Sequence, residues 1–303
     1  MFDRKRSKEQ HAATPYLVVP CTANDDGTKR SEATQAFHST GIKLVSESTG
    51  AAILFPKVGE KCSIIGTVVN YGATGAYSAL AEFYISTPDE ISNAINNGTS
   101  IKPVAYKSAV ISPGKTIEIA CPAEWVVDNP AATIMVQVYD PIMDRLVTSY
   151  DALLDRHVGR KDLAIQGLWV GSQKRHNGDT NPIKMNIQQK GNQANINIDI
   201  TIPDGTDVFE ARTQSFTNVV IDGENFKCGF KGTPNLITDL WEFNLVTENS
   251  MRFKHTLTLL VPKGKPAKPN KKPGGPSSVS EFKPDLPKFE RVTTVCEGVL
   301  QRS

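Results

Sequence analysis

Apolar and polar residues alternate along most of this chain, in short runs that are separated by turn-forming residues. The clearest case is residues 194–202, where isoleucine occupies every second position from Ile196 to Ile202. Residues 58–85 show the same chemistry, with two apolar runs around a turn-rich segment. Because successive side chains of a β-strand point to opposite faces, a period of two predicts strands with one apolar face. The pattern therefore predicts an all-β protein, in which only residues 88–97 are expected as a helical turn or a loop.

Residues 50–165 are expected to form a first domain built from short strands. Turns rich in glycine, proline and asparagine separate the predicted strands, which lie at residues 52–55, 61–69, 79–86, 101–111, 115–121, 133–139 and 145–149. About seven strands over about 110 residues are typical of an immunoglobulin-like β-sandwich. Residues 1–49 are expected as an N-terminal arm with short strands at 16–21 and 41–45.

Residues 166–262 are expected to form a second, antiparallel β domain, either a barrel or a sandwich. Its predicted strands begin at Gly167 and lie at residues 167–171, 183–189, 194–202, 207–221, 225–231, 240–247 and 251–261. Residues 263–288 are rich in proline, lysine and glycine and predict an extended, flexible linker. Residues 289–303 regain alternation, and three alternatives stay open for them: docking on a sheet edge of the same chain, docking on a neighbouring subunit, or a free tail.

Composition narrows the classes of partner. The 303 residues carry a formal net charge of +2, which does not indicate a general nucleic-acid surface. No apolar run approaches the roughly 18–20 residues of a membrane span. The apolar run at residues 16–19 is too short for the core of a secretory signal peptide. We therefore expect no nucleic-acid partner, no membrane span and synthesis in the cytoplasm, with release or export by another route left open.

The five cysteines are scattered, with no CxxC pair and no zinc spacing. Two interpretations stay open for them. One is free thiols in a reducing compartment. The other is a disulfide between Cys62 and Cys121, because both residues fall in predicted strands of the first domain.

The sequence carries no motif of a known catalytic or nucleotide-binding site. There is no HExxH pair, no GxSxG turn, and no glycine-rich phosphate loop of the GxxxxGK[ST] or GxGxxG type. We therefore predict no catalytic residue, no metal site and no cofactor, and we expect that the protein is not an enzyme. A hydrolase whose Ser–His–Asp triad assembles only in space stays as a third alternative.

Two groups of residues are candidates for contact with a ligand or partner. Trp169 and Trp241 lie beside apolar strands, where they form either stacking platforms for a ligand or part of the core. Lys174 and Arg175, in a polar loop, form either a patch for an anionic partner or a solvated loop.

An acidic segment near the end of the first domain holds a third candidate. Asp155, Arg156 and His157 follow several other aspartates, yet no EF-hand spacing is present and basic residues are interleaved. We interpret these three residues as a structural latch at the junction of the two domains.

Residues 53–165 resemble the CARDB-type modules, an immunoglobulin-like family found in bacterial surface and multidomain proteins. The matching segments are VGEKCSIIGTVVNYG, the strand AEFYI, and ISPGKTIEIACPAEW. The resemblance covers about a third of the chain and implies a binding, spacing or assembly role.

Residues 167–261 are similar to small lipocalin- or avidin-like barrels. The matching segments are GLWVG, IKMNIQQKGNQANINI and MRFKHTLTLL. This resemblance implies a closed barrel able to hold a small ligand, but the ligand residues of the family have no counterpart here.

These observations favour a non-enzymatic structural or interaction protein, a component of a bacterial or phage-like assembly or of adhesion. Its tandem β modules are expected to contact a protein partner or further copies of the chain. The alternative is a protein that binds a small molecule or glycan through its second domain.

Overall fold

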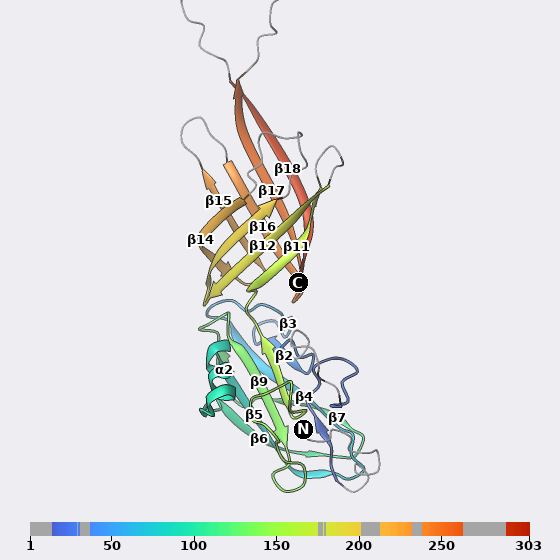
Figure 1. Cartoon of the computed structure of the whole chain (residues 1–303). Helices are drawn as coiled ribbons and strands as arrows, with labels where there is room; N and C mark the ends of the chain where they lie inside the picture. The colour runs from blue at the N-terminus through green and yellow to red at the C-terminus, as the bar shows by residue number, and fades with distance from the viewer. Residues whose placement is uncertain are drawn as a thin grey trace, which may run out of the picture.

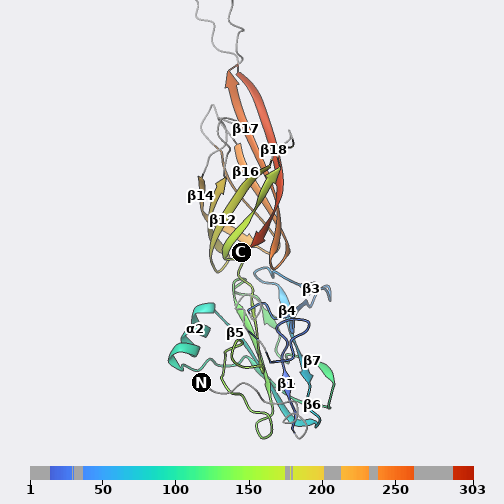
Figure 2. The same cartoon turned by 45° about the vertical axis from the view of Figure 1, so that its right-hand side comes forward.

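The structure is a computed structural model that describes residues 14–28, 30, 37–174, 178, 180–200, 213–231, 238–262 and 289–303. It contains two β domains arranged end to end, joined by residues 163–166 (Figure 1). A view from another side shows the same separation of the two domains (Figure 2). The prediction of an all-β protein is confirmed, and the second domain is a closed barrel, one of the two predicted alternatives.

Two antiparallel sheets make up the first domain. In one sheet, β4 (Lys61–Asn70) pairs with β1 (Leu17–Val18), β2 (Ile42–Ser46), β7 (Thr116–Ala120) and β8 (Trp125–Val126), and β2 also pairs with β3 (Ala52–Ile53). The other sheet has the order β10 (Val158–Asp162), β9 (Thr133–Tyr139), β5 (Ala76–Ser86) and β6 (Ala105–Ile111). Buried side chains of both sheets share one core, which includes Leu44, Ile64, Phe83 and Val136.

The first domain differs from the prediction in several places. The short strands expected at 16–21 and 41–45 are present as β1 and β2, but they belong to the same sheet as β4 and not to a separate arm. Residues 145–149 form no strand, because the Asp155 carboxylate binds the backbone N–H groups of Val147 and Thr148 and holds this segment as a loop. The last strand of the first domain is instead β10. Its polar sequence VGRKD has no alternation of apolar residues, so the strand was not predicted.

One short helix, α2 (Pro88–Asn97), follows β5 and packs on the outer face of its sheet. A capping box starts the helix, since Thr87 accepts from the Glu90 backbone N–H while the Glu90 side chain accepts from the Thr87 N–H. Gly98, with a φ of 66°, ends it in the left-handed conformation that favours glycine. The buried Ile91 joins a small apolar cluster with Tyr84 and Met135.

The second domain is an eight-stranded antiparallel barrel in which each strand pairs with its neighbours in sequence. Its strands are β11 (Gly167–Lys174), β12 (Thr180–Lys190), β13 (Gln193–Ile200), β14 (Thr213–Asp222), β15 (Asn225–Lys231), β16 (Thr238–Thr247), β17 (Ser250–Pro262) and β18 (Phe289–Arg302). Strand β18 closes the barrel by pairing with β17 on one side and β11 on the other. Residues 289–303 therefore dock within the same chain, while the predicted linker 263–288 lies outside the described residues.

Large apolar side chains fill the half of the barrel that faces the first domain. Inward residues alternate with exposed ones along β12 and β13, as the isoleucine pattern predicts. The buried aromatic members of this core are Trp169, Phe216, Phe226, Trp241, Phe243 and Phe253. In this part of the barrel, side chains therefore occupy the space in which a lipocalin-like barrel would hold its ligand.

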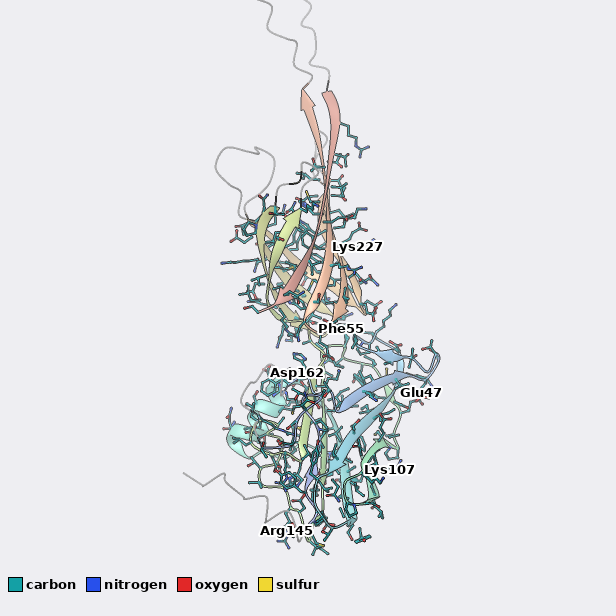
Figure 3. All side chains as sticks on the ribbon, turned by 90° about the vertical axis from the view of Figure 1, so that its right-hand side faces the viewer. Glu47, Phe55, Lys107, Arg145, Asp162 and Lys227 are labelled. Carbon is teal, nitrogen blue, oxygen red and sulfur yellow. The ribbon has the colours of Figure 1, made fainter. Side chains whose placement is uncertain are left out.

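The first domain closes the near end of the barrel. Phe55 and Ile165 belong to the apolar core of the barrel, and Phe55 lies at the junction in Figure 3. Around them, Arg302 donates from Nη2 to the Ala164 carbonyl at 3.1 Å. Lys161 of β10 forms an ion pair with Glu248. The junction is thus an apolar plug surrounded by polar contacts from both domains.

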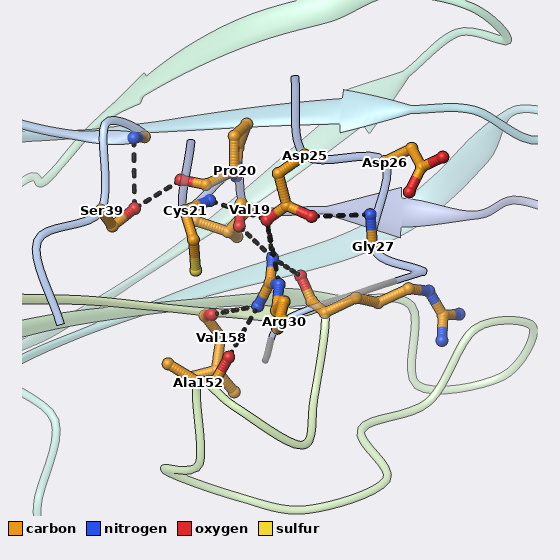
Figure 4. A network of polar contacts seen from close by, with 12 residues as sticks. Val19, Pro20, Cys21, Asp25, Asp26, Gly27, Arg30, Ser39, Ala152 and Val158 are labelled. Carbon is orange, nitrogen blue, oxygen red and sulfur yellow. Dashed lines mark hydrogen bonds and ion pairs between the residues drawn. The ribbon is translucent and has the colours of Figure 1, made fainter. Parts of the chain in front are cut away.

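A buried arginine ties the N-terminal segment to the rest of the first domain. The Arg30 guanidinium donates to the carbonyl oxygens of Asp155 and Val158, each at 2.7 Å, and of Arg156 at 3.0 Å. Its Nε also donates to Asp25 at 3.0 Å. Figure 4 shows these contacts converging on one side chain, which is only 2% exposed.

Candidate functional site: an open seam in the barrel wall

Strands β14 and β15 are joined over only a short stretch. They are in register at Ile221–Phe226 and Asp222–Asn225, beside their connecting turn, whereas β15 and β16 are in register over seven residue pairs. Among the described residues, the rest of β14 pairs with β13 alone and the rest of β15 pairs with β16 alone. We call the unpaired edges, residues 213–220 of β14 and 227–231 of β15, the seam.

A β-bulge in β14 marks the point where the seam opens. Ala194 of β13 lies opposite Val219, but Ile196 lies opposite Phe216, so β14 carries one extra residue between them. Asn218 adopts a φ of 55°, in the left-handed region that asparagine tolerates better than most residues. Such a bulge bends its strand and increases the local twist, and before Ile221 the bulged strand β14 is not in register with β15.

A cleft of about 880 Å³ lies along the seam. Its lining residues come in consecutive runs, 215–220, 225–229 and 238–240. The first two runs belong to β14 and β15, which pair with each other only beside their connecting turn, and the third belongs to β16. The cleft is therefore cut between two backbone edges.

The inner part of the cleft is mainly apolar. Phe216, Val219, Phe226 and Cys228 line it and are buried. The charged residues of the lining are Asp239, which is 2% exposed, and Lys227, which is exposed on the outer wall of the barrel (Figure 3).

Behind the cleft, Asp239 belongs to a closed ring of polar contacts. Its Oδ1 lies 3.0 Å from Nε2 of His255, and its Oδ2 accepts from the Gln214 side-chain amide. The Gln214 Oε1 in turn accepts from Trp241 Nε1 at 2.6 Å. The His255 ring stacks on Trp241 with the centroids 3.9 Å apart, which completes the ring. Because a buried carboxylate must be paired, these partners fix Asp239 at the end of the cleft.

Cys228 is held as a neutral thiol beside this ring. Burial raises the pKa of Cys228 to about 12, and the negative charge of Asp239 adds to the effect. A thiol with such a pKa is a poor nucleophile at neutral pH. Cys228 therefore acts in the cleft as a small apolar group.

The two tryptophans that were candidate ligand contacts both point into the barrel core. Trp169 is fully buried near the first domain and donates from Nε1 to the Ile165 carbonyl at 3.0 Å. Trp241 is 1% exposed and lies behind the seam. Of the two, Trp241 is the one that the structure brings close to the candidate site, through its contacts with Gln214 and His255.

The candidate anionic-partner patch is described only in part. Lys174 is exposed at the end of β11, and it lies beside the outer surface formed by β16, β17 and β18. Arg175 lies outside the described residues. Lys174 does not line the seam.

The candidate latch exists, but it lies within the first domain and not at the junction. His157 Nδ1 is 2.6 Å from Asp155 Oδ1, and His157 Nε2 is 3.1 Å from Asp144 Oδ2. Arg156 forms an ion pair with Asp144 and lies over the Tyr16 ring. The prediction of a latch between the domains is wrong because these residues precede β10, at its far end from the barrel, and bind loops and the N-terminal segment.

This cluster makes the stability of the first domain depend on pH. Burial alone would raise the pKa of Asp155, but hydrogen bonds from His157 and Thr148 outweigh it and lower the pKa to about 2. A carboxylate with a lowered pKa stabilises the folded state above the unfolded pKa of about 3.9, and this contribution is lost as the pH falls towards 2. We expect a loss of about 2 kcal/mol between pH 5 and pH 2, measured by hydrogen exchange of the β9 and β10 amides.

His157 gives the opposite limb of the same pH profile. Burial would lower the pKa of His157, yet the hydrogen bonds to Asp144 and Asp155 raise it. The stabilising contribution of His157 is complete below the unfolded pKa of about 6.5 and is lost as the pH rises through the folded pKa.

Asp155→Asn tests the acid side of this profile. The stability of the variant should fall less between pH 5 and pH 2 than that of the parent protein, and an equally steep fall would contradict the role of Asp155.

All five cysteines are buried, and none of them forms a disulfide in the structure. The alternative of a Cys62–Cys121 disulfide is therefore not realised. Both cysteines nevertheless lie at the same sheet. Cys62 is on β4, opposite Trp125 of β8, and the Cys121 N–H donates to the carbonyl of Ile64, which is also on β4. No group of three or more potential metal ligands lies together among the described residues.

The residues that make the seam were not found from the sequence. The bulge at Asn218 leaves a weak trace, because Phe216 and Val219 are three positions apart and so break the alternation of apolar residues. The polar residues Gln214, Asp239 and His255 interrupt the apolar sides of their strands in the same way. Polar interruptions at inward positions of several strands are the signal from which this site could have been found.

Comparisons with known proteins add little to this geometry. No protein-family model and no curated protein matches the chain. Among solved structures, a redesigned β-barrel is similar with a TM-score of 0.27 and 14% sequence identity, over 46% of this chain and 91% of that one. In the described part of the chain, no helix has the length and apolar character needed to cross a membrane.

Proposed function

We propose that this protein is a non-enzymatic binding and assembly protein whose barrel recognises its partner at the seam between β14 and β15. The first domain, interpreted as an immunoglobulin-like module of CARDB type, supports the barrel through the contacts of Phe55 and Ile165 with the barrel core. The observation that supports this role is the pair of unpaired strand edges around a cleft of about 880 Å³.

The chemistry of the cleft supports binding over hydrolysis. The described lining contains one carboxylate, Asp239, and no histidine or arginine. Both carboxylate oxygens of Asp239 are already engaged by Gln214 and His255. The remaining inner surface is apolar, which suits recognition by burial of apolar area.

A second candidate function uses the same cleft for a small apolar molecule. Its volume lies in the range of about 300–1,000 Å³ that is usual for small-ligand pockets. Side chains fill the half of the barrel that faces the first domain, which favours the seam as the place where such a molecule binds.

A disulfide that closes the seam tests the proposed site. Extending the register of Ile221–Phe226 places Val220 opposite Lys227, and both are exposed. In the variant Val220→Cys/Lys227→Cys, oxidation should form a disulfide that holds the two strand edges together and closes the cleft. Binding of the apolar dye 1-anilinonaphthalene-8-sulfonate should then weaken about tenfold, which corresponds to about 1.4 kcal/mol of binding free energy. Reduction should restore binding, followed by fluorescence titration of the full chain.

A matched disulfide on a seam that is already closed provides the control. Lys184 and Asp199 are exposed and in register between β12 and β13, so Lys184→Cys/Asp199→Cys should leave dye binding unchanged in both redox states. Equal dye binding by the oxidised and reduced forms of the seam variant would show that the seam is not the binding site. Slow hydrogen exchange of the free parent protein, at those amides of residues 214–220 that do not bond to β13, would lead to the same conclusion, because unpaired amides exchange fast.

A further inference from the structure

We infer that the partner taken by the seam is an extended segment of polypeptide, which adds a strand between β14 and β15. This partner class rests on the proposed binding role of the seam and narrows it. A strand is distinguished from other ligands by what the cleft presents to it, namely backbone on both sides.

Two walls of the cleft, β14 and β15, are strand edges, because these strands pair with each other only beside their connecting turn. An edge presents a row of N–H and C=O groups that pair readily with another strand. A small apolar molecule covers the apolar floor but leaves these groups without a partner. An extended peptide satisfies both edges at once, which is the β-augmentation mode of recognition.

The geometry sets the length and direction of the segment. On β15 the unpaired edge runs over residues 227–231, and on β14 over residues 213–220. At about 3.3 Å per residue, the shorter edge accommodates a strand of roughly five residues. Because β14 and β15 are antiparallel, the added strand is parallel to one of them and antiparallel to the other.

Side chains of the cleft set the sequence pattern of the segment. Inward positions of the added strand meet Phe216, Val219 and Phe226, so every second residue should be apolar. On the outer wall, Lys227 is exposed and has no ion pair with any residue in the described part of the chain. An acidic residue at an outward position of the segment would complement Lys227.

Selection from a displayed library of linear seven-residue peptides tests this partner class. The full chain is the target, and the oxidised Val220→Cys/Lys227→Cys protein removes peptides that bind elsewhere. The selected peptides should alternate apolar and polar residues, with an acidic residue among the polar ones. Their affinity for the parent chain should fall at least tenfold when alternate backbone nitrogens are N-methylated, because N-methylation removes the donors and keeps the side chains.

Two further measurements keep the test decisive if the double variant folds poorly. A bound peptide should slow hydrogen exchange at residues 214–220 and 227–231 of the parent chain while leaving β12 unchanged. Lys227→Glu should weaken acidic peptides about tenfold and favour basic ones, whereas Lys184→Glu, on the outer face of β12, should have no effect.

The outcomes separate this inference from the proposed function. If peptides bind with no sensitivity to N-methylation, or if none is enriched although the apolar dye binds at the seam, the inference is wrong and the seam remains a small-ligand site. If neither peptides nor the dye depend on the seam disulfide, both the inference and the proposed function fail.

Discussion

Arg30→Ala is expected to destabilise the first domain by about 3–5 kcal/mol, the usual result of breaking a buried, charged hydrogen-bond network. The Arg30 guanidinium is 2% exposed and is shared between Asp25 and several backbone carbonyls. Its removal leaves Asp25 as a buried carboxylate without its cation. It also removes a donor from the carbonyl groups of Asp155, Arg156 and Val158. The first two keep a backbone donor, but within the described part of the chain the Val158 carbonyl does not, and an unsatisfied group adds to the cost.

Hydrogen exchange of the β9 and β10 amides would report this loss for the first domain alone. Arg30→Lys keeps the charge but not the planar fork of donors, so it should recover only part of the stability. Arg145 is a matched control, since it is exposed and, among the residues that the structure describes, donates only to the Pro141 carbonyl, at 2.7 Å. Arg145→Ala should change stability by less than about 0.5 kcal/mol, and an equal effect of both alanine variants would refute the role of Arg30.

Trp241→Ala should produce the largest loss of stability in the barrel, about 3–5 kcal/mol. The Trp241 ring lies between Phe253 and His255, and its loss opens a cavity directly behind the seam. Trp241→Phe keeps most of the volume but removes the donor to Gln214, which should cost about 1–2 kcal/mol. Urea denaturation, together with hydrogen exchange of β12 and β13 amides, would measure both changes.

The first-domain tryptophan separates a local effect from a general one. Trp125 is also buried, and Trp125→Phe should leave hydrogen exchange in β12 and β13 unchanged. If Trp241→Ala and Trp241→Phe proved equally mild, the barrel core would not be packed around this ring. The apolar dye would then be expected to enter the barrel interior instead of remaining at the seam.

Much of the fold could be predicted because one periodicity governs most of the strands. The isoleucines of β13 and the alternating residues of β4 have one buried and one less buried face, so local pattern and tertiary burial agree. Strand β10 could not be predicted, since Arg160 and Lys161 are buried through ion pairs with Asp162 and Glu248 that only the folded chain brings together.

The candidate site was less accessible to prediction for a related reason. The seam depends on how β14 and β15 pair with each other, and the sequence of each strand alone is compatible with full pairing between them. The incomplete pairing of β14 and β15 accompanies the bulge at Asn218, and a lone asparagine in the sequence does not reveal that its backbone is left-handed. The polar ring joins residues of three strands, namely Gln214, Asp239, Trp241 and His255. No regular spacing along the chain therefore predicts that they meet.

The pairing of β18 with β11 has a consequence for how the protein is made. Trp169 lies opposite Arg302, 133 positions later in the chain, so the barrel cannot close until that last strand has been synthesised. At about 5–20 residues per second, β11 waits roughly 7–27 seconds for its partner, with one edge open to other chains. The first domain is complete well before this point, and its Phe55 and Ile165 already cover the near end of the unfinished barrel. During translation, the first domain would thus act as a template on which the barrel assembles, ahead of any role in the finished molecule.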